Sequence, residues 1–327
     1  MVEFRSWKDP AFVDQIHAWI RSQVAVTGTI EQTHVQIWST VFRVPTADGT
    51  LWAKAPDHAS EASLLRILAA ARPDLVSEVV AIDTDRGWML LRDAGTRLRE
   101  ILDVTPDLSH WESVLAGYAE LQVVMMQHTD RMLAIGVPDF RLEGLPARVA
   151  SLLDAEEFLM LDEPDGLSTD AREELRAQLP EIAALCAELA AYGIGPSIQH
   201  DDLNDGNVFL GGGAYRIVDW GDACVSHPFH TLTVTLRATA YRLDLVPGGA
   251  EILRLRDAYL EPFGAYRTRD ELARAADIAY RTGTLARALA WQSYVASRAP
   301  EDRLPDLESV PYGLKKFLER GPVGSWR

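Results

Sequence analysis

The sequence changes character near residue 92, and this change limits the possible folds more than any other feature. Before it, short runs of β-branched and aromatic residues alternate with turn signals, including Thr46-Ala47-Asp48-Gly49, which is typical of a hairpin. After it, long segments carry apolar residues at three- and four-residue spacing, as amphipathic helices do. The 327 residues therefore predict a small lobe of strands followed by a larger, mainly helical lobe.

The small lobe is expected to hold about five strands with one inserted helix. An opening helix is predicted at 10–23. The predicted strands are 35–38, 41–44, 51–54, 76–82 and 88–91. The inserted helix covers 61–68, with Asp57 and Ser60 as N-cap candidates, and Pro73 ends it.

The second lobe is predicted to be helical around one short hairpin. The predicted helices are 108–128, 171–192, 250–260 and 270–296. The hairpin joins two extended pieces across Gly211-Gly212-Gly213. The predicted fold class is therefore α+β, a bilobal chain with an antiparallel-sheet N-lobe and a mainly helical C-lobe. Its predicted limits are 1–92 for the N-terminal lobe, 93–97 for a hinge and 98–327 for the C-terminal lobe.

Composition excludes several classes of protein. The formal charge is −16, and residues 93–327 carry −14 of it, which is the wrong sign for a nucleic-acid partner. Residues 1–19 lack the apolar core of a signal peptide, and no run approaches the roughly 20 apolar residues of a membrane span. The two cysteines form no CxxC pair. These features predict a cytoplasmic protein without a membrane partner.

A single lysine stands out against the arginines. The chain has 28 Arg and four Lys, and between residues 9 and 314 Lys54 is the only lysine. A compact ammonium serves sites that a planar guanidinium does not, although chance would give the same pattern. Glu61, seven residues later, shares a helix face with three leucines. We expect it to pair with Lys54; the alternative is a first-turn glutamate that complements the helix dipole.

The densest polar cluster is the segment 200–207, which contains three aspartates and two asparagines. It lies between a predicted helix and a short apolar strand, and so should form a loop. Asp219 ends the second strand of the hairpin that follows. An aspartate there and the amide of Asn207 can share a hard divalent cation. A lone lysine, a polar loop and such a cation site are the parts that phosphoryl transfer needs.

At these residues the sequence resembles the aminoglycoside phosphotransferase and choline kinase family, which consists of protein-kinase-like small-molecule kinases. The family's His-Gly-Asp loop, with Asn five residues after the Asp, is matched by His200, Asp202 and Asn207. Its Ile-Asp-Trp segment is similar to Val218-Asp219-Trp220, with Asp222 after it. The resemblance implies a protein-kinase-like fold.

The resemblance also implies roles for single residues. Asp202 would be the catalytic base and Lys54 the phosphate-binding lysine. Asn207 and Asp219 would hold Mg²⁺, with ATP or GTP as the phosphate donor. Other expected residues serve the nucleotide or support the loop. Ser39 and Thr40 replace the glycine-rich phosphate loop, Leu91, Asp93 and Ala94 lie near the nucleotide base, and His200, Asp201 and Asp222 support the loop.

Several alternatives stay open. Asp201 stands where the family usually has Gly, which leaves two neighbouring candidates for the base, with the spacing in favour of Asp202. A kinase-like module that binds nucleotide without transferring phosphate would keep the same fold. A metal-dependent hydrolase could use the loop together with His227 and His230. The acidic second lobe favours a cationic hydroxyl substrate such as an aminoglycoside, amino sugar or amino alcohol.

Overall fold

A computed structural model describes residues 7–298, 303 and 306–325. The chain forms two compact units. Unit 1 comprises residues 1–103, 134–137 and 205–221, and unit 2 comprises 104–133, 138–204 and 222–327. Unit 1 thus contains the hairpin that the sequence assigned to the second lobe. The lobe limits of 1–92 and 98–327, with a hinge at 93–97, stay predictions.

The fold class is confirmed, because an antiparallel N-terminal sheet precedes a helical C-terminal part. The sequence-based expectation about a signal peptide concerned residues 1–19, of which 1–6 lie outside the described residues. Within the described part of the chain, no helix combines the length and apolarity that crossing a bilayer requires.

Unit 1 is built on a five-stranded antiparallel sheet with the strand order β1-β2-β3-β5-β4. Its elements are α1 (Pro10–Gln23), β1 (Glu31–Val35), β2 (Ser39–Thr46), β3 (Gly49–Pro56), α2 (Ser60–Ala71), β4 (Val79–Asp83) and β5 (Trp88–Arg92). A second antiparallel sheet contains β6 (Thr96–Arg97), β8 (Val208–Gly211) and β9 (Ala214–Ile217). Helix α3 (Leu98–Val104) follows β6.

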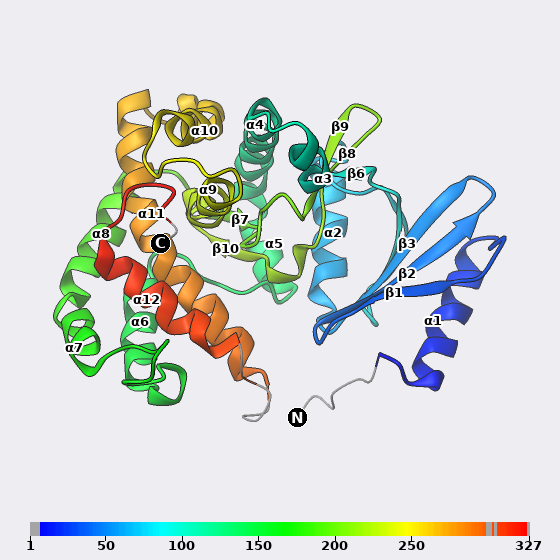
Figure 1. Ribbon diagram of the computed structural model, residues 1–327, viewed down its shortest axis with the longest axis horizontal. Coiled ribbons are helices and arrows are strands. Elements are labelled where there is room, and N and C mark those ends of the chain that lie inside the picture. Colours follow the sequence, from blue (N-terminus) through cyan, green and yellow to red (C-terminus); the bar gives the residue numbers. More distant parts are fainter. Residues whose placement is uncertain (1–6, 299–302, 304–305, 326–327) are drawn as a thin grey trace. The chain divides into compact units, whose positions relative to one another are not determined.

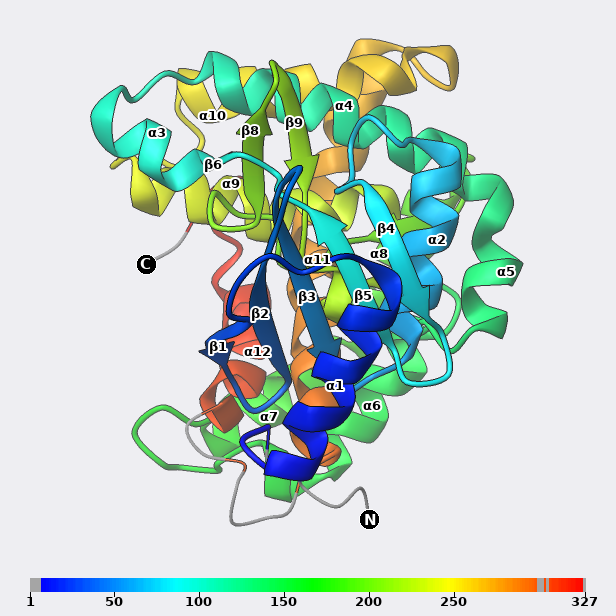
Figure 2. The ribbon, with the colours of Figure 1, turned by 90° about the vertical axis from the view of Figure 1, so that its right-hand side faces the viewer.

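The two faces of the large sheet are covered by different helices. Figures 1 and 2 show α1 on one face and α2 on the other. Along β3, Ala53 and Ala55 are buried in the same apolar core as Ile16 of α1. Because side chains alternate along a strand, Lys54 points to the opposite face, where α2 lies. The two-residue period of β3 therefore determines which helix the lysine meets.

Two predicted strands of unit 1 are partly wrong. The strand predicted at 35–38 ends at Val35, since the Gln36 amide donates to the Ser39 carbonyl (2.9 Å) in a tight turn. Ile37 and Trp38 are apolar but exposed beside this turn. The strand predicted from residue 76 begins at Val79, and Val76 instead forms an isolated parallel bridge with Ile217 of β9.

Unit 2 is mainly helical, and its core is formed largely by α6, α8, α11 and α12. Its helices are α4 (Ser109–Met125), α5 (Thr129–Ala134, whose last residue belongs to unit 1), α6 (Leu145–Asp154), α7 (Thr169–Ala177), α8 (Leu179–Ala191), α9 (Thr231–Arg242), α10 (Ala250–Leu260), α11 (Arg269–Ala296) and α12 (Ser309–Glu319). Strands β7 (Ser197–Gln199) and β10 (Cys224–Ser226) pair antiparallel. Short 3₁₀ turns cover Met126–His128, Glu156–Phe158, Trp220–Asp222 (whose first two residues belong to unit 1), Pro228–His230, Glu261–Ala265 and Asp306–Glu308.

Two helical predictions differ from the structure for physical reasons. The single helix predicted at 171–192 is two helices, α7 and α8, with Pro180 in the first turn of α8. Proline has no backbone N–H to donate, so it begins a helix better than it continues one. Helix α9 was not predicted, because four of its residues are threonines with low helix propensity. Burial of its apolar residues Leu232, Val234 and Leu236 stabilises the helix instead.

The segment after β5 packs closely against β8 through two glycines. Gly95 has a φ of +102°, and a Cβ there would lie 2.3 Å from the Leu210 carbonyl oxygen. A Cβ at Gly211 would lie 2.6 Å from the Ala94 carbonyl oxygen. The pairing of β6 with β8 therefore depends on two residues that lack a side chain.

Gly95→Ala tests this close approach. It should lower the free energy of unfolding by about 3 kcal/mol or more, because it adds a steric clash to an unfavourable positive φ. Gly49→Ala is the matched control, since Gly49 has a φ of +114° with no atom near its Cβ position. The control should cost only about 1 kcal/mol in urea unfolding. Equal losses in the two variants would show that the packing is not tight.

Candidate active site

Lys54 lies between two carboxylates in unit 1. Its Nζ donates to Glu61 Oε1 and to Asp219 Oδ1, at 2.6 Å each. The side chain of Lys54 is 12% exposed and that of Glu61 only 4%. Burial alone would lower the pKa of Lys54, but the two carboxylates raise it above its ordinary value. The ion pair predicted between Lys54 and Glu61 is therefore present, and Asp219 joins it.

The cluster of Lys54, Glu61 and Asp219 contains one ammonium and two carboxylates, so one negative charge is not balanced. Burial raises the pKa of Glu61, Lys54 opposes that effect, and the nearby Asp219 adds to it. An ammonium has three N–H donors, and two of those on Lys54 are taken. Among the described residues no acceptor for the third is found. The cluster can thus accept one further oxygen ligand at Lys54 and a cation near its carboxylates.

Asn207 and Asp219 lie at the base of the β8–β9 hairpin. Val208 pairs with Ile217, and the Val218 amide donates to the Asn207 carbonyl (3.0 Å). These contacts hold the two ends of the hairpin next to each other. Asp219 has a φ of +64°, in the left-handed region that aspartate adopts more readily than most residues. The hairpin therefore holds an amide and a carboxylate at the two ends of its base.

These two residues are suited to Mg²⁺, which prefers oxygen ligands and takes few of them from protein. The Asp219 side chain is 45% exposed and so can reach a ligand. Within the described ranges, no three His, Cys, Asp or Glu side chains form a metal cluster. A cation at this hairpin would therefore take its remaining ligands from phosphate oxygens and water.

The structure distinguishes between the two residues predicted to replace the glycine-rich loop. Thr40 is fully buried, and its hydroxyl donates to the His34 carbonyl and accepts from Gln32, both at 2.8 Å. These contacts join β2 to β1 and favour a structural role for Thr40. Ser39 is also buried, at the first position of β2. Its predicted contact with phosphate stays a prediction.

The segment predicted to lie near the nucleotide base is held by its own contacts. Leu91 pairs with Trp52 across β5 and β3. The carboxylate of Asp93 accepts from the Trp52 indole (2.7 Å) and from the Gly95 amide (2.9 Å). Asp93 therefore shapes the turn that carries Ala94. The contact of these residues with a nucleotide base stays a prediction.

In unit 2, His200 supports the polar loop. The residue is fully buried, its backbone amide donates to the Tyr118 hydroxyl (2.8 Å), and its Nδ1 accepts from the Asp202 amide (3.3 Å). The Asp202 carbonyl in turn accepts from the Asn204 side chain (3.1 Å). The loop around Asp202 is thus positioned by hydrogen bonds to its backbone. Tyr118 was not identified from the sequence, where it is one of nine tyrosines without a distinguishing pattern.

Asp201 forms a buried ion pair that the sequence did not reveal. Its carboxylate accepts from Arg287 Nη1 of α11 (2.6 Å), with the two side chains 7% and 13% exposed. Asp201 has a φ of +63°, the conformation that glycine adopts easily, which explains how aspartate fits where the family has Gly. Because Arg287 holds Asp201, the half-buried Asp202 is the better candidate for a base.

Burial and neighbouring charges shift the pKa values of both Asp201 and Arg287. Burial raises the pKa of Asp201 to about 6, although Arg287 opposes the shift. Burial alone would lower the pKa of Arg287, but Asp201, Asp222 and Asp202 raise it above its usual value. Asp222 therefore acts on the loop through charge, whereas its predicted support by direct contact stays a prediction.

His227 and His230, the two histidines considered as metal ligands, belong to the packing of unit 2. His230 is buried, with its ring nitrogens 2.7 Å from the Ser226 hydroxyl and 3.0 Å from the Thr282 hydroxyl. Burial lowers the pKa of His230 to about 3 and that of His227 well below its usual value. His227 accepts from the Phe229 amide (3.2 Å). These contacts give no support to the hydrolase alternative.

The antiparallel sheet with its buried lysine–glutamate pair and the Asp-x-x-x-x-Asn loop before a hairpin define a kinase-like phosphotransferase. A model of the phosphotransferase enzyme family matches residues 27–274. The chain belongs to this family, and it is accordingly a small-molecule phosphotransferase. No curated protein matches the sequence significantly.

Solved structures share the fold at low sequence identity. A choline/ethanolamine kinase family protein from Mesorhizobium loti is 19% identical, with a TM-score of 0.58 over 94% of this chain and 93% of its own. A GDP complex of aminoglycoside 2'-phosphotransferase-IIIa is 14% identical, with a TM-score of 0.58 over 96% and 98%. Choline kinase from Cryptosporidium parvum Iowa II is 10% identical, with a TM-score of 0.61 over 94% and 95%.

The raised pKa of Asp201 predicts a pH dependence of stability. Between pH 4 and 6 the folded protein holds a proton on Asp201 that the unfolded chain has released. Stability from this group is therefore fully present below pH 4 and is lost as the pH rises through about 6. In Asp201→Asn this loss is absent. The free energy of unfolding in urea should be measured at pH 4 and pH 7. The value for Asp201→Asn relative to wild type should rise by about 3 kcal/mol from the lower to the higher pH. A difference that is independent of pH would contradict the assignment.

Proposed function

We propose that the protein transfers the γ-phosphoryl group of ATP or GTP to a hydroxyl group of a small molecule. The observation that carries the proposal is the buried Lys54 between Glu61 and Asp219, with one N–H for which the described residues provide no acceptor. Phosphoryl transfer relies on positioning and on charge stabilisation rather than on covalent chemistry by the protein. A lysine fixed at two of its three donors is suited to that task.

The nucleotide phosphates are assigned to Lys54. Glu61, buried on α2, holds the ammonium in place while the free N–H binds a phosphate oxygen. Asn207 and Asp219 are assigned to Mg²⁺. When bound, the cation supplies neutralisation of phosphate charge, and the hairpin supplies its two protein ligands. Asp219 also contacts Lys54, so the same carboxylate would bind the cation and hold the lysine that binds the phosphates.

The acceptor hydroxyl is assigned to Asp202. A carboxylate there would orient the hydroxyl and accept its proton during transfer. Asp201 is already bound to Arg287, and the His200 ring accepts the Asp202 amide. These contacts limit the freedom of the Asp202 backbone, which favours a defined position of its carboxylate.

Asp202→Asn tests the assignment of the acceptor hydroxyl to Asp202. The variant keeps the shape of the side chain but cannot accept the proton, so turnover should fall by about 10²–10⁴-fold. The assay is Mg²⁺-nucleotide consumption with ATP and GTP across a panel of sugars, amino sugars, hydroxy acids, amino alcohols and aminoglycosides. The rise in melting temperature with Mg²⁺-nucleotide should persist in the variant.

Asp244→Asn is the control, because it makes the same substitution at an exposed aspartate of unit 2 that is not a candidate site residue. It should keep wild-type turnover. Equal rates for Asp202→Asn and wild type would disprove the role of Asp202. A nucleotide-dependent rise in melting temperature without turnover on any acceptor would favour a nucleotide-binding module instead.

A further inference from the structure

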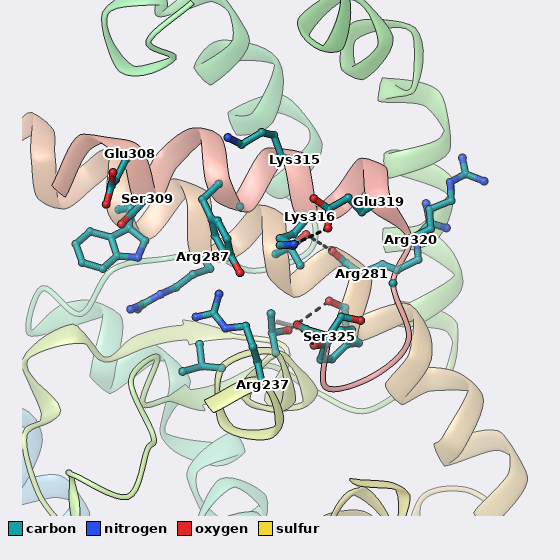
Figure 3. A pocket seen from close by; sticks show the side chains of 18 of the residues that line it. Arg237, Arg281, Arg287, Glu308, Ser309, Lys315, Lys316, Glu319, Arg320 and Ser325 are labelled. Atoms are coloured by element: carbon teal, nitrogen blue, oxygen red, sulfur yellow. Dashed lines mark hydrogen bonds and ion pairs between the residues drawn. The ribbon is translucent and has the colours of Figure 1, made fainter. Parts of the chain in front are cut away.

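Unit 2 contains a cavity of about 390 Å³ whose walls are rich in positive charge. Helices α9, α11 and α12 supply most of its lining, and Figure 3 shows their charged side chains around it. Its cationic lining residues are Arg237, Arg281, Arg287, Lys315, Lys316 and Arg320. Three acidic residues also line it, and all three are exposed. The more deeply placed charge is therefore positive, although the net charge of the protein is −16.

Most of these cations have protein partners. Lys316 pairs with Glu319 (2.5 Å), and Arg281 and Arg320 both contact Glu181 (3.1 Å). The Lys315 ammonium donates to a backbone carbonyl (2.9 Å). Each of these four cations therefore has a protein acceptor that holds it in place around the cavity.

Arg237 differs from them. It is half-buried on α9, and its guanidinium lies over the Tyr312 ring, 5.3 Å from the ring centroid. Within the described part of the chain, no carboxylate lies within ion-pair distance of it. A partly desolvated cation without a counter-ion is unfavourable, and a bound anion would relieve this cost.

Arg287 connects the cavity to the candidate catalytic loop. One of its terminal nitrogens holds Asp201, the residue before Asp202, while its buried Nε has no partner among the described residues. The guanidinium also lies over Trp291, 5.0 Å from the ring centroid. A ligand that reached this nitrogen would therefore lie next to the loop that carries Asp202.

We infer that this cavity binds the phosphate acceptor, and that the acceptor carries an oxyanion, a carboxylate or a phosphate group, bound by Arg237 and Arg287. The inference rests on the proposed function. It differs from the expectation of a cationic acceptor, which depends on net charge summed over residues 93–327 and stays a prediction. Guanidinium groups bind both oxyanions through paired N–H donors, whereas an ammonium group would be repelled from these walls.

Binding to the full-length protein without nucleotide tests the inference. D-glucose, D-glucosamine, D-gluconate and D-glucose 6-phosphate share a hydroxylated chain or ring and differ in charge. Calorimetric titration at low salt should show binding of gluconate or glucose 6-phosphate and weaker binding of the neutral and cationic compounds. Which of the two binds more tightly identifies the oxyanion. No binding of either anion, or a preference for glucosamine, would overturn the inference.

Arg237→Gln should weaken the binding of the anion by about 10–100-fold. Arg237→Lys should restore part of it, since the charge returns without the paired donors. Arg242→Gln removes the same charge from the same helix outside the cavity lining, and it should leave the Kd within about twofold of wild type. An unchanged Kd in Arg237→Gln would place the anion elsewhere and overturn the inference.

The proposed function and this inference can fail separately. If anions bind through Arg237 but no hydroxyl compound stimulates nucleotide consumption, the anion site stands and the phosphotransfer to such an acceptor does not. If a neutral or amine-bearing acceptor is phosphorylated at the same rate by Arg237→Gln and wild type, the proposed function stands and the inference fails.

Discussion

The ion pairing of the buried Lys54 ammonium is the interaction on which the rest of the candidate site in unit 1 depends. Its two carboxylate partners come from different elements, Glu61 from α2 and Asp219 from the end of the β8–β9 hairpin. A buried charge that loses its partner typically costs about 3–5 kcal/mol. The alternation of β3, the position of α2 and the closure of the hairpin are therefore coupled through one side chain.

Unit 2 also contains a buried ion pair, between Asp201 and Arg287. Asp201 and Arg287 lie 86 residues apart in sequence, and their contact ties the polar loop to α11. The same arginine lines the cationic cavity. Asp201 takes a backbone conformation that suits glycine, and its carboxylate is bound to Arg287. The residue that stands where the family usually has Gly thus contacts an arginine that also lines the cavity.

Much of this arrangement could be predicted from local sequence patterns. The strand period places Lys54 on the face opposite Ala53, and the helix period places Glu61 on the inward side of α2. Both rules act over a few residues, and so the ion pair between Lys54 and Glu61 could be predicted from the sequence. Contacts between residues far apart in sequence could not be predicted, because no local pattern links Asp201 to Arg287 or His200 to Tyr118. The expectation of a cationic acceptor stays a prediction, because net charge summed over residues 93–327 does not separate exposed acids from the half-buried arginines that line the cavity.

The most direct test of the account observes the Lys54 ammonium itself. The chain has only four lysines, so selective ¹⁵N labelling of lysine Nζ limits the spectrum to four side-chain signals and the Lys54 signal is identified by its loss in Lys54→Arg. Buried, ion-paired Lys54 should exchange its protons slowly and give a resolved signal. Addition of Mg²⁺-ADP should shift this signal and leave the other three in place. A Lys54 signal that does not move at saturating nucleotide would contradict the central claim.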